Sequence, residues 1–171
     1  QSENFTLVGS LEMIWQESDL AYSPDSCQCM VKKLEIGDLT ALAAEKNIIL
    51  PIVTFFNQQG NRWSQNRFVY LDPHGLATYR ERFTVTLQAP DFNFRAYPFD
   101  RQQFHVRIDF NVPTEFFRFE IGGDSSSLGA QLGEEQWSVV NVTQKVSEIP
   151  LEKNLSKSRF TLTMEVKRHL N

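Results

Sequence analysis

Apolar residues alternate with polar ones along one segment near the start of the chain, and this period of two constrains the fold more than any other feature. The residues of its more apolar face are Leu7, Gly9, Leu11, Met13 and Trp15. Alternation of this kind gives a strand one apolar face, whereas a helix needs apolar residues spaced three or four apart. We therefore expect a long strand over residues 7–15.

Further strand-like segments follow, separated by residues that favour turns. The predicted strands cover residues 48–57, 67–71, 76–87, 103–110, 116–121, 137–146 and 159–168. The sequence from Asp72 to Gly75 predicts a hairpin turn. Predicted loops cover residues 22–28, 58–65, 122–135 and 147–158.

One segment has helical character. Residues 34–45 predict a short helix, with Asp38 as the residue that caps its start. Eight or nine strands with frequent turns and one helix are typical of an all-β protein. The expected fold is therefore an antiparallel β-sandwich, formed as a single domain over residues 1–171.

Charge and hydropathy exclude several classes of protein. The formal net charge is −4 at pH 7, which argues against binding of nucleic acid through phosphate contacts. The longest apolar stretch, residues 48–56, is broken by Pro51 and Thr54, so no segment is expected to cross a bilayer as a helix. Because the chain opens at Gln1 rather than Met, we expect that an upstream segment was removed.

The two cysteines stand close together as Cys27 and Cys29. The favoured interpretation is a pair of thiols in a loop, and the alternatives are a local disulfide or half of a metal site. A structural zinc site is not expected, because no second cysteine or histidine pair has ligand spacing.

Residues for catalysis are not grouped in the sequence. It contains no nucleophile elbow and no phosphate-binding glycine loop. His74, His105 and His169 are far apart along the chain, and the pair Glu134 and Glu135 stands in a polar segment that we expect to be solvated. An enzyme is therefore not expected.

One motif is far more specific than the rest. Residues 94–104 read Phe-Arg-Ala-Tyr-Pro-Phe-Asp-Arg-Gln-Gln-Phe. This resembles the aromatic-Pro-Phe-Asp-x-Gln loop of pentameric ligand-gated ion channels. In animal members two bridged cysteines enclose thirteen residues, and here Asp91–Gln103 is thirteen residues flanked by Pro90 and Phe104. The resemblance is thus to bacterial members without that disulfide.

In such a member, packing has to hold the loop in place of the bridge. The aromatic residues expected to do so are Phe92, Phe94, Phe99 and Phe104.

Four weaker matches occur in the same order along the chain. Trp15-Gln16-Glu17 resembles the family's Trp-x-Asp, and Pro51–Asn57 resembles its Trp-x-Pro segment with Ile49 in place of Trp. Asp72–Gly75 stands where the family has a Pro-Asp-Gly turn, and Val166–His169 is similar to the end of its last strand. The resemblance implies a first strand before Gln1 and four transmembrane helices after Asn171.

The family binds ligands between subunits, and the resemblance implies candidate residues on two faces. The principal-face candidates are Phe56, Phe110 and Asn111, and the complementary-face candidates are Ser10, Glu12, Arg67 and Tyr79. A cage for a quaternary amine needs several aromatic rings. By resemblance, residues 146–159 correspond to loop C, one of the loops that form the family's ligand site. Since this segment contains no aromatic residue, a choline-type agonist is not expected.

The resemblance also implies residues that couple ligand binding to the pore. They are Tyr97, Pro98, Phe99, Asp100 and Arg168. We expect Asp100 and Arg168 to form a charged cluster at the membrane-facing end of the domain, joined by two parallel hydrogen bonds.

A calcium site is a further candidate. Glu12, Glu17, Asp19 and Glu81, together with the acidic loop 122–135, offer the oxygen ligands that calcium prefers, although surface charge is the favoured interpretation. No other cofactor is expected.

The resemblance thus implies the extracellular, or periplasmic, domain of a homopentameric inner-membrane channel. Its expected partners are identical subunits, a small-molecule agonist or cation, and its own transmembrane domain. The alternatives are a freestanding soluble ligand-binding protein of the same fold, like the snail acetylcholine-binding proteins, or a carbohydrate-binding sandwich.

Overall fold

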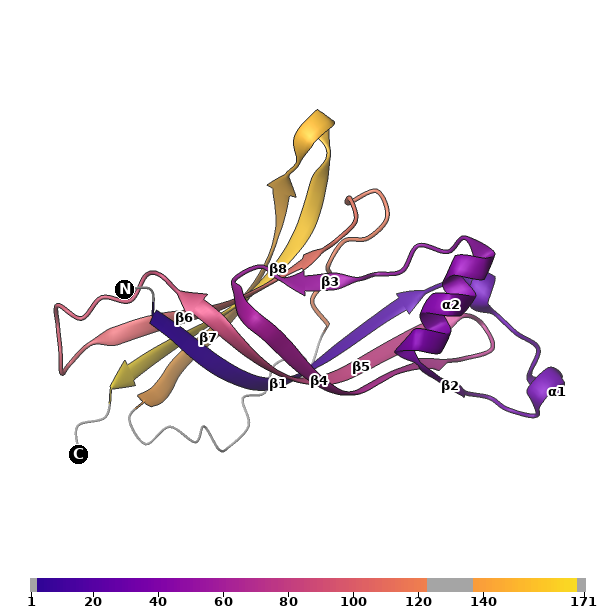
Figure 1. The fold of residues 1–171 in the computed structure, drawn as a ribbon, viewed down its shortest axis with the longest axis horizontal. Coiled ribbons are helices and arrows are strands. Elements are labelled where there is room, and N and C mark those ends of the chain that lie inside the picture. Colours follow the sequence, from indigo (N-terminus) through magenta and orange to yellow (C-terminus); the bar gives the residue numbers. More distant parts are fainter. Residues whose placement is uncertain (1–2, 123–136, 169–171) are drawn as a thin grey trace. The chain divides into compact units, whose positions relative to one another are not determined.

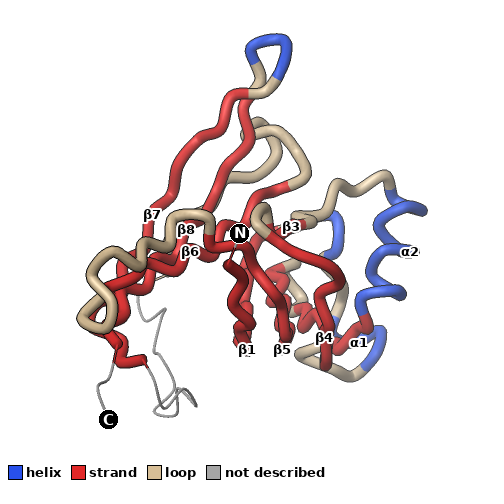
Figure 2. Tube along the Cα trace, turned by 60° about the vertical axis from the view of Figure 1, so that its left-hand side comes forward, coloured by secondary structure: helices blue, strands red, loops and turns tan. Residues whose placement is uncertain are grey.

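The computed structural model describes residues 3–122 and 137–168, and most of them lie in strands (Figures 1 and 2). The strands are β1 (Glu3–Gln16), β2 (Lys32–Glu35), β3 (Val53–Phe55), β4 (Gln58–Leu71), β5 (Leu76–Ala89), β6 (Arg101–Phe110), β7 (Trp137–Pro150) and β8 (Ser156–Arg168). The helical elements are η1 (Ser18–Leu20), α1 (Pro24–Cys27), α2 (Ile36–Lys46) and η2 (Glu152–Asn154). No helix in the described part of the chain is long and apolar enough to span a membrane.

The strands form two four-stranded antiparallel sheets, in the orders β1-β5-β4-β2 and β3-β6-β8-β7. The expected all-β antiparallel fold is confirmed. The chain divides into two compact units. The C-terminal unit (Gln1–Phe5, Pro51–Gln59 and Leu87–Asn171) contains the second sheet, and the N-terminal unit (Thr6–Leu50 and Gly60–Thr86) contains most of the first.

The core of the N-terminal unit lies between its strands and α2. Alternate residues of β5 are buried, as the strand period requires, and α2 buries Leu39 and Ala43, which are four residues apart. The cluster that they join consists of Leu20, Leu39, Ala43, Leu50, Val69, Leu71, Ala77 and Tyr79. Apolar burial at helical and strand spacing therefore fixes this unit.

The start of the helix differs from the prediction. Helix α2 begins at Ile36 after the cap residue Glu35, and Asp38 lies inside the first turn. The reason is that residues 32–35 form β2 and pair with β4, so the extended chain reaches as far as Glu35. An acidic side chain in the first turn still favours the helix through its dipole.

Several predicted boundaries are wrong because pairing between strands overrides local composition. Residues 58–65, predicted as a loop, belong to β4, and the predicted strand 48–57 shrinks to β3 after Pro51. The predicted loop 147–158 is mostly strand, because β7 and β8 extend into a long hairpin with η2 at its tip (Figure 2). All but the first residue of the predicted loop 122–135, as well as His169, lies outside the described residues.

The predicted strand over residues 116–121 is also wrong. This segment does not pair with a strand. Isolated hydrogen bonds hold it to the start of β8 instead: just before it, Thr114 N–H donates to the carbonyl of Ser156 (2.8 Å), and within it Phe119 N–H donates to the hydroxyl of Ser158 (2.9 Å). Its alternate aromatic residues mimic a strand because Phe117 and Phe119 pack against the ring of Phe110.

The cysteines form a bond that the sequence left open. Cys27 and Cys29 are joined by a disulfide, so the favoured prediction of two free thiols is wrong. Residues 24–27, predicted as part of a loop, form the short helix α1, and Gln28 then takes a left-handed conformation (φ 52°). This turn brings the two Cα atoms to 5.2 Å, within the range that a disulfide requires.

The predicted turn at Asp72–Gly75 is confirmed as the β4–β5 connection. The side chain of Asp72 stabilises the turn, because its Oδ1 accepts hydrogen bonds from the backbone N–H groups of His74 and Leu76, both at 2.9 Å. Gly75 has φ +87°, and its carbonyl accepts a hydrogen bond from Glu17 N–H (2.8 Å). A side chain at this position would collide with the Glu17 backbone.

We expect Gly75→Ala to lower the free energy of unfolding more than Gly60→Ala. Both glycines have positive φ, so each alanine brings a strain of about 1 kcal/mol. Only Gly75 also has a backbone neighbour in the way, whereas an added Cβ at Gly60 meets nothing within 4 Å. Urea denaturation of both variants tests this, and equal losses would contradict the proposed contact.

Candidate functional site

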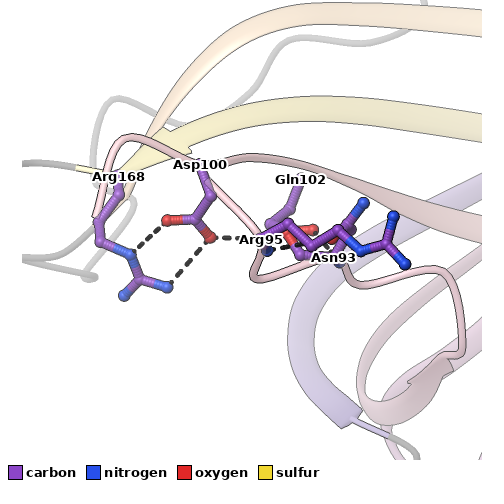
Figure 3. Close-up of polar contacts among 5 residues, drawn as sticks. All are labelled: Asn93, Arg95, Asp100, Gln102 and Arg168. Atoms are coloured by element: carbon purple, nitrogen blue, oxygen red, sulfur yellow. Dashed lines mark hydrogen bonds and ion pairs between the residues drawn. The ribbon is translucent and has the colours of Figure 1, made fainter. Parts of the chain in front are cut away.

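The first candidate site lies where the loop before β6 meets the end of β8. Asp100 is 1% exposed, and Arg168 donates to its carboxylate from Nε to Oδ1 (2.9 Å) and from Nη2 to Oδ2 (3.3 Å). The backbone N–H of Arg168 also donates to the Asp100 carbonyl (3.3 Å). The predicted pairing of Asp100 with Arg168 is therefore present in the structure (Figure 3).

Gln102 supports this ion pair from the other side (Figure 3). Its Nε2 donates to Asp100 Oδ2 (2.7 Å) and to the carbonyl of Asn93 (2.9 Å), while its Oε1 accepts from Asn93 N–H (3.0 Å). Asn93 in turn accepts from Arg95 N–H at 3.0 Å. Since Gln102 is only 3% exposed, this amide is a buried link between the loop and the carboxylate.

Aromatic rings complete the surroundings of Arg168. Its guanidinium carbon lies 4.3 Å from the ring centre of Trp137 and 5.0 Å from that of Tyr97. A cation in this position is attracted electrostatically by the face of the aromatic ring. The arginine is thus fixed by a carboxylate and by two rings at once.

The predicted aromatic packing of the loop is present only in part. Phe92 contacts both Phe94 and Phe104, at ring-centre distances of 6.0 and 5.0 Å. Phe99 is instead 75% exposed, so it does not contribute to holding the loop. Tyr97 is also exposed (65%), so the rings of both Tyr97 and Phe99 reach the surface.

The surroundings of the Asp100 carboxylate favour its ionised form. The hydrogen bond from Arg168 is the main cause; burial acts in the opposite direction, and the bond from Gln102 adds to the first effect. Together they hold the pKa of Asp100 below its ordinary value of 3.8.

The second candidate site lies at the other end of the β6–β8 pair. Asp109, 1% exposed, accepts from Arg159 Nε (2.6 Å) and Nη2 (2.8 Å), and Lys157 Nζ lies 2.9 Å from its Oδ2. The guanidinium of Arg159 also lies over the ring of Phe56, 4.1 Å from its centre. Burial alone would raise the pKa of Asp109, but the bonds from Arg159 and Lys157 outweigh it and lower the pKa.

The principal-face candidates differ in accessibility. Phe56 is 59% exposed, and Asn111 is exposed and accepts a hydrogen bond from Thr54 (2.9 Å). Phe110 is 5% exposed and stacks on Phe119 at 3.9 Å, so its ring belongs to the core. The structure thus brings Phe56 and Asn111 to the surface around Asp109 and excludes Phe110 from it.

The complementary-face candidates form two separate groups in the N-terminal unit. Tyr79 is 4% exposed and donates to Glu81 Oε2 (2.6 Å), while Arg67 donates to the Tyr79 hydroxyl (3.0 Å). Glu12 pairs with Arg80 at 2.7 Å, where both side chains are about half exposed or more, and Ser10 lies on the exposed face of β1.

The candidate calcium ligands are not brought together. Glu81 is 2% exposed and is bound by Ser64, Tyr79 and Arg62, while Glu12 is bound by Arg80. Within residues 3–122 and 137–168 no three acidic, histidine or cysteine side chains are placed to hold one metal ion. The expected cluster of Glu12, Glu17, Asp19 and Glu81 is therefore absent from the part of the chain that the structure describes.

Besides Asn93 and Trp137, sequence reasoning missed four residues of the two sites: Gln102, Asp109, Lys157 and Arg159. Gln102 stood inside the recognised motif, so its position was a usable signal. The other three carry charge on strands, and a charged residue that alternates with apolar ones reads as a solvated outer face. Only the pairing of β6 with β8 shows that Asp109 and Arg159 stand opposite each other.

Comparison with known proteins shows a likeness to part of an ion channel. No protein-family profile matches the chain. The chain is 28% identical over 108 residues to a proton-gated ion channel of Gloeobacter violaceus. The match covers 63% of this chain and 27% of the relative, so the chain spans about a quarter of the length of that relative.

We expect Asp100→Ala to lower the free energy of unfolding by about 3–5 kcal/mol, because it leaves a mostly buried guanidinium without its carboxylate. The matched control is Arg101→Ala, next in sequence, whose pair with Glu165 is 61% and 30% exposed and should contribute under about 1 kcal/mol. Urea denaturation near neutral pH measures both.

The same pair gives a pH dependence with a definite sign. Because the pKa of Asp100 is lowered on folding, its stabilisation is complete above the ordinary value of 3.8 and is lost as the pH falls through the lower, folded-state pKa. The difference between Asp100→Ala and the unchanged protein should therefore shrink below pH 3.8. A constant difference would contradict the ionised pair.

Tyr79 should stay protonated at pH values where ordinary tyrosines ionise. Burial and the hydrogen bond to Glu81 raise its pKa to about 12, although the bond from Arg67 acts in the opposite direction. We expect Glu81→Gln to lower this pKa toward 10, and Glu12→Gln, an exposed carboxylate in the same unit, to leave it unchanged. NMR of the tyrosine ring carbons between about pH 9 and 11.5 measures it, and no effect of Glu81→Gln would refute the assignment.

Proposed function

We propose that this protein is the extracellular, periplasmic ligand-sensing domain of a pentameric ligand-gated ion channel. The likeness to part of a proton-gated ion channel supports the class, and the antiparallel β fold agrees with it. The observation that carries the proposal is the Pro-Phe-Asp segment, whose Asp100 is buried and paired with Arg168 near the end of the chain.

In this proposal five identical subunits form a ring, and the ligand binds between neighbours. The principal face presents Phe56 and Asn111 around Asp109, and the complementary face presents Ser10, Glu12 and Arg67. Binding shifts an equilibrium between a resting and an open state, which requires the ligand to bind those two states differently.

Coupling to the membrane domain is assigned to the Asp100 end. The pair with Arg168 links the loop containing Tyr97, Pro98 and Phe99 to the last strand of the sheet. Since that loop exposes Tyr97 and Phe99, it offers aromatic side chains for contact with pore helices of the complete channel. A movement of β8 is then transmitted to the loop because the two are joined by both side-chain and backbone hydrogen bonds.

Electrophysiology tests the proposal. The gene encoding this chain is expressed in oocytes, and currents are recorded while external pH and small-molecule ligands are varied. We expect gated currents, and cross-linking should give species up to a pentamer. A secreted, soluble product that conducts no current would favour the freestanding ligand-binding protein instead.

The coupling role of the ion pair predicts non-additive effects on gating. Asp100→Ala and Arg168→Ala should each reduce maximal current more than they change ligand binding, and the double variant should be less impaired than the sum of the two. Arg101→Ala, beside the pair but exposed, is the control. Strictly additive effects, or normal responses in either single variant, would show that the pair does not couple the loop to β8.

A further inference from the structure

The register of three strands gathers positive charge on the outward face of the C-terminal sheet. Opposite partners in antiparallel strands point to the same face. Arg107 and Lys145 both stand opposite Thr161, and Asp109 and Ser147 both stand opposite Arg159. Lys157 lies two residues from Arg159 and so shares its face. Near the carboxylate of Asp109 this face therefore carries the cations Arg107, Lys145, Lys157 and Arg159, while Glu165, further along β8 on the same face, pairs with Arg101.

One carboxylate cannot neutralise this set. Asp109 is held by Arg159 through two hydrogen bonds and by Lys157 at 2.9 Å. An ammonium group has three donors, and Asp109 accepts from one of those of Lys157. The Lys157 side chain is 26% exposed, so its remaining donors can face solvent.

The exposed ring beside these cations is not arranged to receive a positively charged ligand. The guanidinium of Arg159 already lies over Phe56 at 4.1 Å. The ring is nevertheless 59% exposed, so it leaves apolar surface open next to the charged groups. Thr54 and Asn111, joined by a hydrogen bond of 2.9 Å, add polar groups at the same strand ends.

We propose that this face binds a small organic carboxylate, with the carboxylate on Lys157 and the apolar part of the molecule against Phe56. The inference rests on the proposed function, whose ligand site it specifies, and it assigns an anionic ligand to that site. Lys157 and Arg159 are the residues that determine this preference. Asp109 positions them, because it holds both cations beside the ring.

Butyrate is a suitable probe, with butylamine and butyramide as cationic and neutral molecules of similar size. Proton–nitrogen NMR titration of the protein should show shifts in the signals of β8 and of the Arg159 side chain with butyrate. Neither control molecule should produce them. Raising the salt concentration should weaken the binding, because screening reduces the attraction between exposed charges.

Variants identify the residues. Lys157→Gln should weaken butyrate binding by up to about fivefold, the effect of losing one partly exposed charge pair, whereas Lys157→Arg should retain it. Lys167→Gln is the matched control, because it lies on the same strand and face but ten residues away. Phe56→Ala should weaken butyrate more than acetate, since acetate has no chain to place on the ring.

Two results would overturn this inference: stronger binding of butylamine than of butyrate at this face, or equal effects of Lys157→Gln and Lys167→Gln. The outcome is separable from that of the proposed function. Butyrate binding by a protein that conducts no current would retain the carboxylate site and refute the channel, whereas currents opened by a cationic ligand at this face would do the reverse.

Discussion

The register between β6 and β8 is the constraint on which both charged sites depend. In this pairing Asp109 stands opposite Arg159, and nine residues further along Asp100 meets Arg168. The two acids and the two arginines have the same spacing, so one register satisfies both pairs. A slip of one residue would turn the side chains to the wrong faces and leave buried carboxylates without partners. The sheet is therefore specified by charge as well as by apolar burial.

The two ends of this strand pair differ in their surroundings and in what they are suited to do. At the Asp100 end the arginine is enclosed by a carboxylate and two rings, and Gln102 ties the carboxylate to the preceding loop. At the Asp109 end the acid is equally buried, but its cations and Phe56 reach the surface. The first arrangement is suited to holding the loop before β6 against the end of β8, and the second is suited to binding a molecule from solution.

Sequence patterns were sufficient where one segment determines its own structure. The alternating residues of β1 and the turn chemistry of Asp72 and Gly75 are local, and both predictions are confirmed. The contact between Asp100 and Arg168 was likewise predicted, because the resemblance supplied both residues, whereas the predicted packing of Phe99 is not present. The polar first half of β4 and the aromatic segment 116–121 were misread, since their state is decided by which strand or ring lies beside them. The cluster at Asp109 was missed for the same reason: its members lie up to fifty residues apart, and only the pairing unites them.

A ligand anion at Lys157 would act on the same cations that Asp109 holds. The anion and Asp109 would share the positive charge of Lys157 and Arg159, so binding would alter how firmly β8 is tied to β6 at that end. Strand β8 continues without interruption from Lys157 to Arg168, which binds Asp100. A change in the pairing of β8 at the Asp109 end would therefore reach the ion pair at Asp100. A ligand shifts an equilibrium only if it binds the two states with different affinity. Here the difference would arise because the anion competes with Asp109 for Lys157 and Arg159, and it would win more readily in a state where β8 is less firmly paired with β6. In this protein the ion pairs that secure the sheet would thus also be the elements through which a ligand changes it.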